Sequence, residues 1–288
     1  MENNTIKFSK KLPTFRVSGG LGKHIMFSTL LPAITKKYGK INIISPYTEV
    51  FINNKNIEHS IFIDDFENNK SVYKEGISKI YAYEPYSCEF SFDDKHILES
   101  WIEAYDLDRK YISTPKVYVP EEIKADAKEI ISKLKNDFKD GYIIVQFSGG
   151  QSPVGFDPEK SQYNINNMVI ERNYPQQMAQ ILINKIKDKY PNMGIINCSL
   201  PNEYNFDNVI RIERGFLHYF EFVQKAKTVI CIDSMLQHIS STTDTKTIVL
   251  WNNKAWNPSH KYGWNLDNFT NIEGPNMCID YDEVLELI

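Results

Sequence analysis

The sequence predicts an α/β protein built from two doubly wound, mainly parallel sheets. Short β-branched runs alternate with amphipathic stretches along the chain, as strands alternate with helices in α/β folds. The runs YIIVQF at 142–147 and TVICID at 228–233 are apolar on both faces, which is typical of parallel strands covered by helices on each side. The segment YISTPKVYVPEE has two prolines and no helical period, so it predicts a linker near 111–120.

Apolar β-branched runs define the expected strands, and apolar residues three and four apart define the expected helices. Gly39, Gly141 and Gly194 stand where a helix is expected to give way to a strand. The first half, 1–118, is expected to hold strands at 15–18, 41–45, 61–63 and 80–83 and helices at 24–38 and 94–105. The second half, 119–288, is expected to hold strands at 142–147, 194–197, 209–211, 228–232 and 247–251 and helices at 120–137, 175–190, 217–226 and 236–242.

Length and composition exclude several classes of protein. The 288 residues suffice for about two domains, and 42% hydrophobic with 24% charged residues is ordinary for a globular chain. A net charge of −4 argues against binding nucleic acid through bulk charge. The four cysteines are widely separated with no CxxC pair, which favours a reducing compartment over a zinc ribbon or a disulfide scaffold. The start lacks the apolar core of a secretory signal and no apolar run is long enough to span a membrane, so we expect a cytoplasmic protein.

A glycine-rich loop, Ser18-Gly-Gly-Leu-Gly-Lys-His24, separates the first expected strand from the first expected helix. Gly19, Gly20 and Gly22 permit a tight turn and close approach of a ligand, and the following helix offers N–H groups to an anion. Lys23 and His24 add a charge and a proton carrier. A magnesium-dependent P-loop is disfavoured because Val17 replaces its first glycine and His24 its hydroxyl residue. A substrate-facing loop and a plain strand-to-helix turn both remain open.

A second candidate site follows the expected strand at 228–232. Asp233 and Ser234 stand at its carboxyl end, where open α/β sheets bind ligands. The amides of Ser234 and Met235 open the next helix and are placed to hold a diphosphate. His238 lies four residues after Ser234 and is expected on the same helix face. The alternatives are that Ser234 only caps the helix and that His238 only packs in the core.

A third candidate site begins the second half of the chain. Ser148 and Gly149 follow the strand YIIV, and their small size allows the backbone to approach an anion. Arg172 precedes Pro175, which is well placed at the first turn of a helix. The guanidinium of Arg172 is therefore a candidate phosphate ligand, the alternative being a solvated arginine.

These three sites, in this order, resemble the ADP-heptose lipopolysaccharide heptosyltransferases of glycosyltransferase family nine. AKTVICIDSMLQHISSTTDTKTIVLW is similar to the family's ADLVIGPDSGLMHLAAALGTPTIALFG, with Asp233, Ser234 and His238 at the family's Asp, Ser/Thr and His. GGLGKHIMFSTLLPAITKKYG resembles the family's N-terminal loop and helix, and Ser148-Gly149 with Arg172 resemble its donor-phosphate loop and basic residue.

The resemblance implies a GT-B fold, in which two Rossmann-like domains face a central cleft. It implies that 1–118 binds the acceptor and that 119–288 binds a nucleotide-diphosphate sugar, which is a co-substrate, with no cofactor. Transfer would invert the anomeric carbon and need no metal. The diphosphate would rest against Ser148, Gly149, Arg172 and the amides of Ser234 and Met235, which stabilise the leaving group.

The chain departs from the family at the residue thought to act as general base. Lys23 stands where the family has aspartate, and a protonated lysine accepts no proton unless its pKa is strongly lowered. His24 is the nearest substitute, followed by the carboxylates Glu49, Glu84, Asp93 and Asp94. Two other functions stay open: a nucleotide-sugar hydrolase or epimerase, and an inactive nucleotide-sugar-binding protein. The acceptor is equally open between a glycan, a lipid-linked glycan, a protein and modified DNA.

Overall fold

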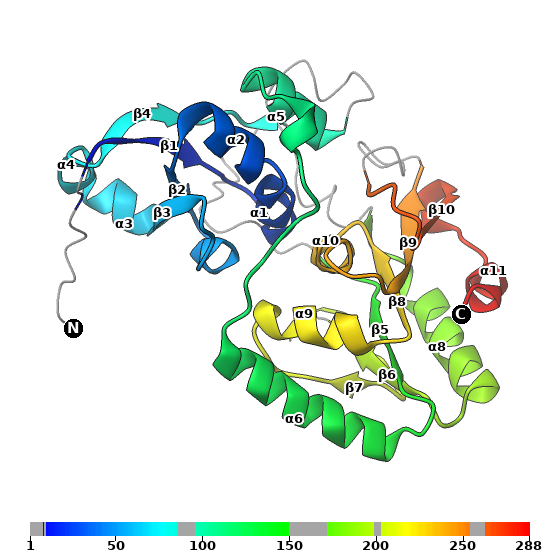
Figure 1. Cartoon of the computed structure of the whole chain (residues 1–288). Helices are drawn as coiled ribbons and strands as arrows, with labels where there is room; N and C mark the ends of the chain where they lie inside the picture. The colour runs from blue at the N-terminus through cyan, green and yellow to red at the C-terminus, as the bar shows by residue number, and fades with distance from the viewer. Residues whose placement is uncertain (1–7, 9, 86–95, 150–171, 199–202, 254–262) are drawn as a thin grey trace. The chain divides into compact units, whose positions relative to one another are not determined.

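The structure is a computed structural model that describes residues 8, 10–85, 96–149, 172–198, 203–253 and 263–288. The chain divides into two compact units, Met1–Tyr118 and Val119–Ile288. Each unit contains one parallel sheet, of four strands in the first and six in the second (Figure 1). The predicted α/β fold with two parallel sheets is therefore confirmed. The predicted cleft between the units stays a prediction.

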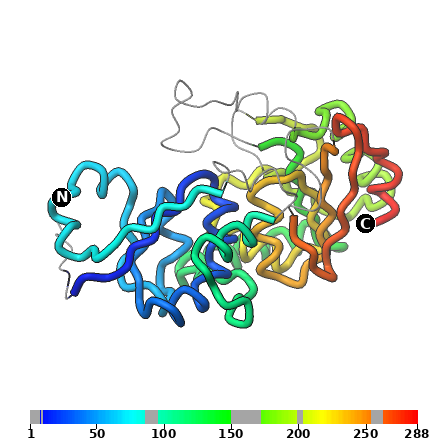
Figure 2. The backbone as a smooth tube through the Cα atoms, turned by 90° about the horizontal axis from the view of Figure 1, so that it is seen from above, coloured from blue at the N-terminus to red at the C-terminus, as the bar shows by residue number. Residues whose placement is uncertain are grey.

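The first unit orders its strands β3-β2-β1-β4, and every neighbouring pair is parallel. Figure 2 shows β1 and β4 running side by side. The strands are β1 (Leu12–Arg16), β2 (Ile41–Ser45), β3 (Ile57–Phe62) and β4 (Ile77–Tyr81). The helices are α1 (Leu21–Ser28), α2 (Leu31–Tyr38), η1 (Thr48–Phe51), α3 (Ile63–Asn68), α4 (Lys70–Tyr73), α5 (Ile97–Ala104) and η4 (Arg109–Tyr111).

Helices cover both faces of this first sheet. On one face, the ring of Phe15 in β1 packs against Phe27 of α1, with 6.2 Å between ring centroids. On the other face, Ile44 of β2 belongs to a buried cluster with Phe66 of α3 and Tyr73 of α4. The sheet is therefore doubly wound, because each face buries its apolar side chains against different helices.

The single helix predicted over 24–38 is in fact two helices, α1 and α2. Pro32 lies in the first turn of α2, and a proline has no N–H with which to bond the carbonyl four residues earlier, at Ser28. The hydroxyls of Ser28 and Thr29 instead donate to the carbonyls of Ile25 and Met26, at 2.6 and 2.8 Å. The prediction was wrong here because it gave the apolar period more weight than the proline.

The second unit orders its strands β10-β9-β8-β5-β6-β7, which in chain order is the 6-5-4-1-2-3 arrangement of a dinucleotide-binding Rossmann sheet. Its strands are β5 (Tyr142–Gln146), β6 (Gly194–Asn197), β7 (Ile210–Arg211), β8 (Thr228–Ile232), β9 (Lys246–Asn252) and β10 (Phe269–Gly274). Its helices are α6 (Glu121–Asp137), α8 (Gln176–Lys189), α9 (Phe216–Lys225), α10 (Met235–Ser240), η6 (Pro275–Met277) and α11 (Tyr281–Glu286). The sequence predicted five of the six strands and missed β10.

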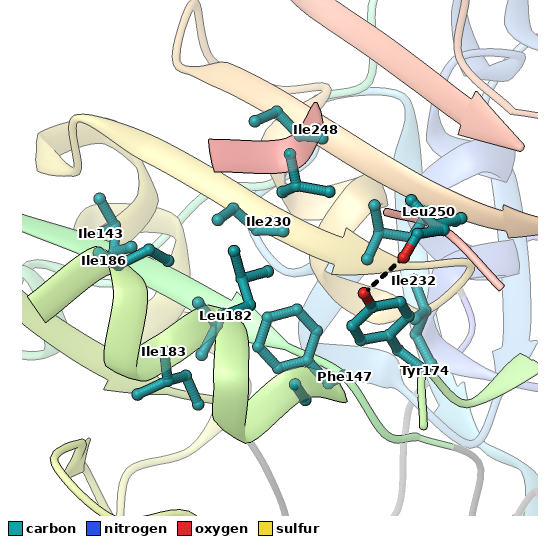
Figure 3. Close-up of a cluster of buried hydrophobic side chains, with 14 of the residues drawn as sticks. Ile143, Phe147, Tyr174, Leu182, Ile183, Ile186, Ile230, Ile232, Ile248 and Leu250 are labelled. Carbon is teal, nitrogen blue, oxygen red and sulfur yellow. Dashed lines mark hydrogen bonds between the residues drawn. The ribbon is translucent and has the colours of Figure 1, made fainter. Parts of the chain in front are cut away.

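A large core cluster of the second unit lies between its sheet and helices α8 and α11. Leu182, Ile183 and Ile186 of α8 pack against isoleucines and leucines of β5, β8 and β9 (Figure 3). Tyr174 is fully buried in this cluster, and its hydroxyl donates to the carbonyl of Ile279 at 2.9 Å. That hydrogen bond replaces the one that the phenol would make to water if it were exposed. Burial nevertheless raises the pKa of Tyr174 to about 12.

Each sheet changes winding direction beside its first strand. In the first unit β1 lies between β2 and β4, and in the second β5 lies between β6 and β8. The connections leaving such a strand pair diverge, which opens a crevice at the carboxyl ends of the strands. A ligand site is therefore expected at the carboxyl ends of β1 with β4 and of β5 with β8. None of the helices in the described ranges is long and apolar enough to cross a membrane.

Candidate functional site

The glycine loop leads from β1 into α1 at the carboxyl edge of the first sheet. Gly19 has φ +91°, a left-handed conformation that favours glycine. A Cβ at Gly19 would lie 2.9 Å from Cδ of Lys23, so the lysine stem folds directly over this residue. Gly20 caps the helix and has open space around it. Gly22 lies inside the first turn of α1, so only two of the three glycines belong to the turn itself.

Lys23 is buried and forms an ion pair with Glu84. The second oxygen of the Glu84 carboxylate accepts a hydrogen bond from the hydroxyl of Ser18 at 2.8 Å. Glu84 follows β4, which pairs with β1, so the sheet brings together two residues 61 positions apart. Burial lowers the pKa of Lys23, and the Glu84 carboxylate opposes that shift.

His24 lies in the core under the loop. Its side chain is fully buried, and its ring nitrogens lie 3.0 Å from the carbonyl oxygen of Gly20 and 3.1 Å from that of Val17. Burial lowers the pKa of His24 to about 4, against the raising effect of these hydrogen bonds. The position does not support His24 as the predicted base, because both nitrogens face backbone carbonyls and burial disfavours the imidazolium that a base becomes.

In the second unit the loop after β5 meets the residues after β8. A Cβ at Gly149 would lie 3.5 Å from the Cβ of Ser234, which is ordinary contact. The amide of Gly149 donates to Oδ1 of Asn173 at 3.1 Å, so the loop is tied to the segment that carries Arg172. Ser148 is buried, and its hydroxyl oxygen accepts from the amide of Tyr204 at 3.4 Å. The structure thus places Gly149, Arg172 and Ser234 at one sheet edge, and their binding of a common ligand stays a prediction.

Gln146, the last residue of β5, organises this edge. Its Oε1 accepts hydrogen bonds from the hydroxyl of Ser234 at 2.5 Å and from the amide of Leu236 at 3.2 Å. The hydroxyl of Ser234 is therefore committed to Gln146 and makes no cap bond to its own helix. No role was predicted for Gln146 from the sequence. A lone amide at the end of the apolar run YIIV was the available signal.

Asp233 orients Arg172, the side chain predicted to bind a phosphate. Its Oδ2 lies 3.4 Å from Nη1 of Arg172, and its Oδ1 accepts from the side-chain amide of Gln237. Burial raises the pKa of the Asp233 carboxyl, and Arg172 opposes the shift. Arg172 remains about one-third exposed, so this guanidinium is oriented by a carboxylate while part of it faces solvent.

Helix α10 continues from this edge. Met235 is its first residue and half-buried, and its six residues limit any contribution from a helix dipole. His238 is buried, and its Nδ1 accepts a hydrogen bond from the indole N–H of Trp264 at 3.1 Å. Because an indole only donates, this bond fixes Nδ1 as the unprotonated nitrogen. His238 therefore ties α10 to the segment around Trp264.

The two edges carry different chemistry. The first presents a carboxylate, Glu84, held by a lysine and a serine, which is suited to accepting a proton. The second presents Arg172, oriented by Asp233 beside small residues, which is suited to an anion such as a phosphate. Across the described ranges, no three His, Cys, Asp or Glu side chains gather closely enough to hold a metal ion.

No family model and no curated protein sequence matches the chain. Several solved structures are similar to this chain over nearly the whole length of both proteins. A family 9 glycosyl transferase from Veillonella parvula has a TM-score of 0.69 at 12% identity, covering 99% of this chain and 97% of that one. ADP-heptose lps heptosyltransferase II from E. coli has a TM-score of 0.66 at 13% identity, covering 96% and 97%.

A third match is E. coli heptosyltransferase WaaC with ADP-2-deoxy-2-fluoro heptose, with a TM-score of 0.55 at 12% identity, covering 96% of this chain and 98% of that one. Likeness at such low identity shows the fold alone. The chain therefore has the GT-B fold of these transferases, and the resemblance noted in the sequence is confirmed at the level of structure.

Proposed function

We propose that the protein is a glycosyltransferase that moves a sugar from a nucleotide-diphosphate donor to an acceptor hydroxyl, with inversion and without a metal. The observation that carries the proposal is the Arg172–Asp233 pair beside Gly149 and Ser234, at the point where the second sheet changes winding direction. A guanidinium there stabilises a departing diphosphate, as a metal ion does in other enzymes. The donor is held by residues 119–288 and the acceptor by residues 1–118.

Glu84 is the general base in this proposal. The family places its carboxylate directly after the glycine of the loop, where this chain has Lys23. Here the segment after the adjacent strand β4 supplies a carboxylate that pairs with that lysine, so a negative group remains at the same sheet edge. Lys23 and Ser18 each bind one oxygen of the Glu84 carboxylate and so orient it. Lys23 is then a positioning residue.

The reaction is a single displacement. Glu84 accepts the proton of the acceptor hydroxyl as its oxygen forms a bond to the anomeric carbon. The bond from that carbon to the diphosphate oxygen breaks, and its electron pair leaves with the nucleoside diphosphate. Arg172 stabilises the charge that accumulates on the leaving group.

Donor binding is tested with a thermal-shift panel of nucleoside diphosphates and nucleotide sugars, headed by ADP-heptose because a relative was solved with an analogue of it. One ligand class should raise the melting temperature, and Arg172→Ala should remove the shift. Arg214→Ala is the matched control, since Arg214 forms an ion pair with Asp126 elsewhere in the same unit. If no nucleotide stabilises the protein, or both variants behave alike, the donor site is refuted.

Turnover is tested by release of the nucleoside diphosphate with glycan, lipid-linked glycan, protein and modified-DNA acceptors. Glu84→Gln should lower kcat by about 10²–10⁴-fold while leaving donor binding unchanged. Glu58→Gln, which removes the surface partner of Lys40, is the control and should keep full activity. Release without an acceptor would indicate a hydrolase, and binding without release an inactive binding protein. Either result would overturn the transferase.

A further inference from the structure

A pocket of about 480 Å³ opens in the first unit, away from the glycine loop. It is bounded by the end of α1, by α2, by the turn before β3 and by the segment that follows η4. Its lining residues include Thr35, Lys36, Asn56, Tyr111, Lys116 and Tyr118. Residues 54–56 precede β3, so the pocket lies at the amino edge of the parallel sheet, whereas Gly19 and Glu84 lie at the carboxyl edge. The five residues of β1 separate these edges by about 16 Å.

Three lysines and no carboxylate line this pocket. Lys36, Lys55 and Lys116 are exposed, and none forms an ion pair with a residue in the described ranges. Nearby carboxylates are already neutralised by other lysines: Asp106 by Lys37, Glu58 by Lys40 and Asp108 by Lys110. Among the described residues of the unit, no ion pair balances the positive charge of the pocket, so an anion would be attracted to it.

The uncharged groups of the pocket also favour an anion. Oδ1 of Asn56 accepts from the hydroxyl of Thr35 at 3.1 Å, and Oδ1 of Asn54 accepts from the amide of Asn56 at 3.1 Å. Since both amide oxygens are used, the side-chain NH₂ groups are the ends left to donate. The aromatic rings of Tyr111 and Tyr118 supply flat apolar faces, and Nζ of Lys36 lies 5.7 Å from the Tyr111 ring centre.

We propose that this pocket binds a phosphorylated carbohydrate. Lys36, Lys55 and Lys116 hold the phosphate, and the tyrosine rings contact the sugar. The site is distinct from the proposed donor site, because it lies in the other unit and uses none of the same residues. Lys116 and Tyr118 belong to the segment that leads directly into the second unit, so the ligand contacts the connection between the two units.

The test is calorimetric titration of the full-length protein at low ionic strength with glucose 1-phosphate, inorganic phosphate and glucose. Glucose 1-phosphate should bind saturably, inorganic phosphate more weakly, and glucose not at all. Each single Lys→Gln change at positions 36, 55 and 116 should weaken binding about fivefold, since an exposed charge pair contributes about 1 kcal/mol. The triple variant should show no saturable binding. Tyr118→Ser should weaken the binding of glucose 1-phosphate and leave the binding of inorganic phosphate unchanged.

A triple variant at Lys10, Lys11 and Lys74 is the matched control, because these exposed lysines of the same unit lie outside the pocket. It should bind as the wild type does. Arg172→Ala should also retain this binding, which separates the pocket from the donor site. The proposal is overturned if the wild type shows no saturable binding, if the control loses as much affinity as the pocket variant, or if Arg172→Ala abolishes it. Equal affinity for glucose 1-phosphate and inorganic phosphate would refute the proposal that the pocket recognises a carbohydrate.

Discussion

Replacing Glu84 by glutamine removes the carboxylate that pairs with the buried ammonium of Lys23 and keeps the size of the side chain. The pKa of Lys23 is already lowered by burial, and the two effects that raise it both come from Glu84. In the variant the pKa should therefore fall further. The folded protein then contains either a buried ammonium without this counter-charge or a neutral lysine.

Deprotonation sets the upper limit of the cost. Neutralising a lysine of pKa 10.5 at pH 7 costs about 4.8 kcal/mol, at about 1.36 kcal/mol for each pH unit. Glu84 is about one-third exposed, so water already screens the pair and reduces the loss. We expect Glu84→Gln to lower the free energy of unfolding by about 2–3 kcal/mol at pH 7, below the range of about 3–5 kcal/mol for breaking a fully buried pair.

The sign of the pH dependence follows from the direction of the pKa shift. A lysine with a lowered pKa binds fewer protons when folded than when unfolded, so stability rises with pH between its folded and unfolded pKa values. This rise begins at lower pH in Glu84→Gln than in the wild type, where Glu84 still raises the pKa. The difference in stability should therefore shrink by about 1–2 kcal/mol between pH 7 and pH 9.

Trp101 is a suitable reporter for this unit. It is buried, and its indole N–H donates to the carbonyl of Tyr83, next to Glu84, at 3.3 Å. Urea unfolding followed by fluorine NMR of 5-fluorotryptophan-labelled protein separates its signal from those of the tryptophans in the second unit. In a Lys23→Met background, Glu84→Gln should cost little, with no pH dependence. An equal cost in both backgrounds, or a cost that does not change with pH, would refute the reasoning.

Three further changes test the fold, each measured as the free energy of urea unfolding. Gly19→Ala should cost about 1–3 kcal/mol because of its positive φ and the lysine stem above it, whereas Gly20→Ala, at a helix cap with open space, should cost only about 0.5 kcal/mol. Leu182→Ala should cost about 2–5 kcal/mol by leaving a cavity in the core, and Ile181→Ala, at an exposed position of the same helix, less than about 0.5. Tyr174→Phe should cost about 1–2 kcal/mol, because a buried carbonyl loses its donor. Equal costs within either pair, or no cost at Tyr174, would contradict the structure.

Local sequence predicted the buried strands well. The bounds of β2, β6 and β8 are those expected from the sequence, since each is an apolar run buried along its whole length. The edge strands β3 and β4 begin four and three residues earlier than expected, because strands with partly or fully exposed side chains carry a weaker pattern. β10, with the polar sequence FTNIEG, was missed for the same reason. Its strand conformation depends on pairing with β9, which no local pattern contains.

Local sequence was enough to predict which loops follow the ends of strands and are candidates for a functional site. Glycines and polar residues directly after apolar runs, as at Gly19 and Asp233, mark strand ends in any α/β sheet, because backbone and side-chain periodicity are local properties. Which of these loops lie next to one another became known from the three-dimensional fold. The pairing of Glu84 with Lys23 and of Gln146 with Ser234 depends on strand order, which places β4 beside β1 and β8 beside β5. Strand order results from the packing of helices on both faces of each sheet, so it depends on contacts between residues far apart in the chain.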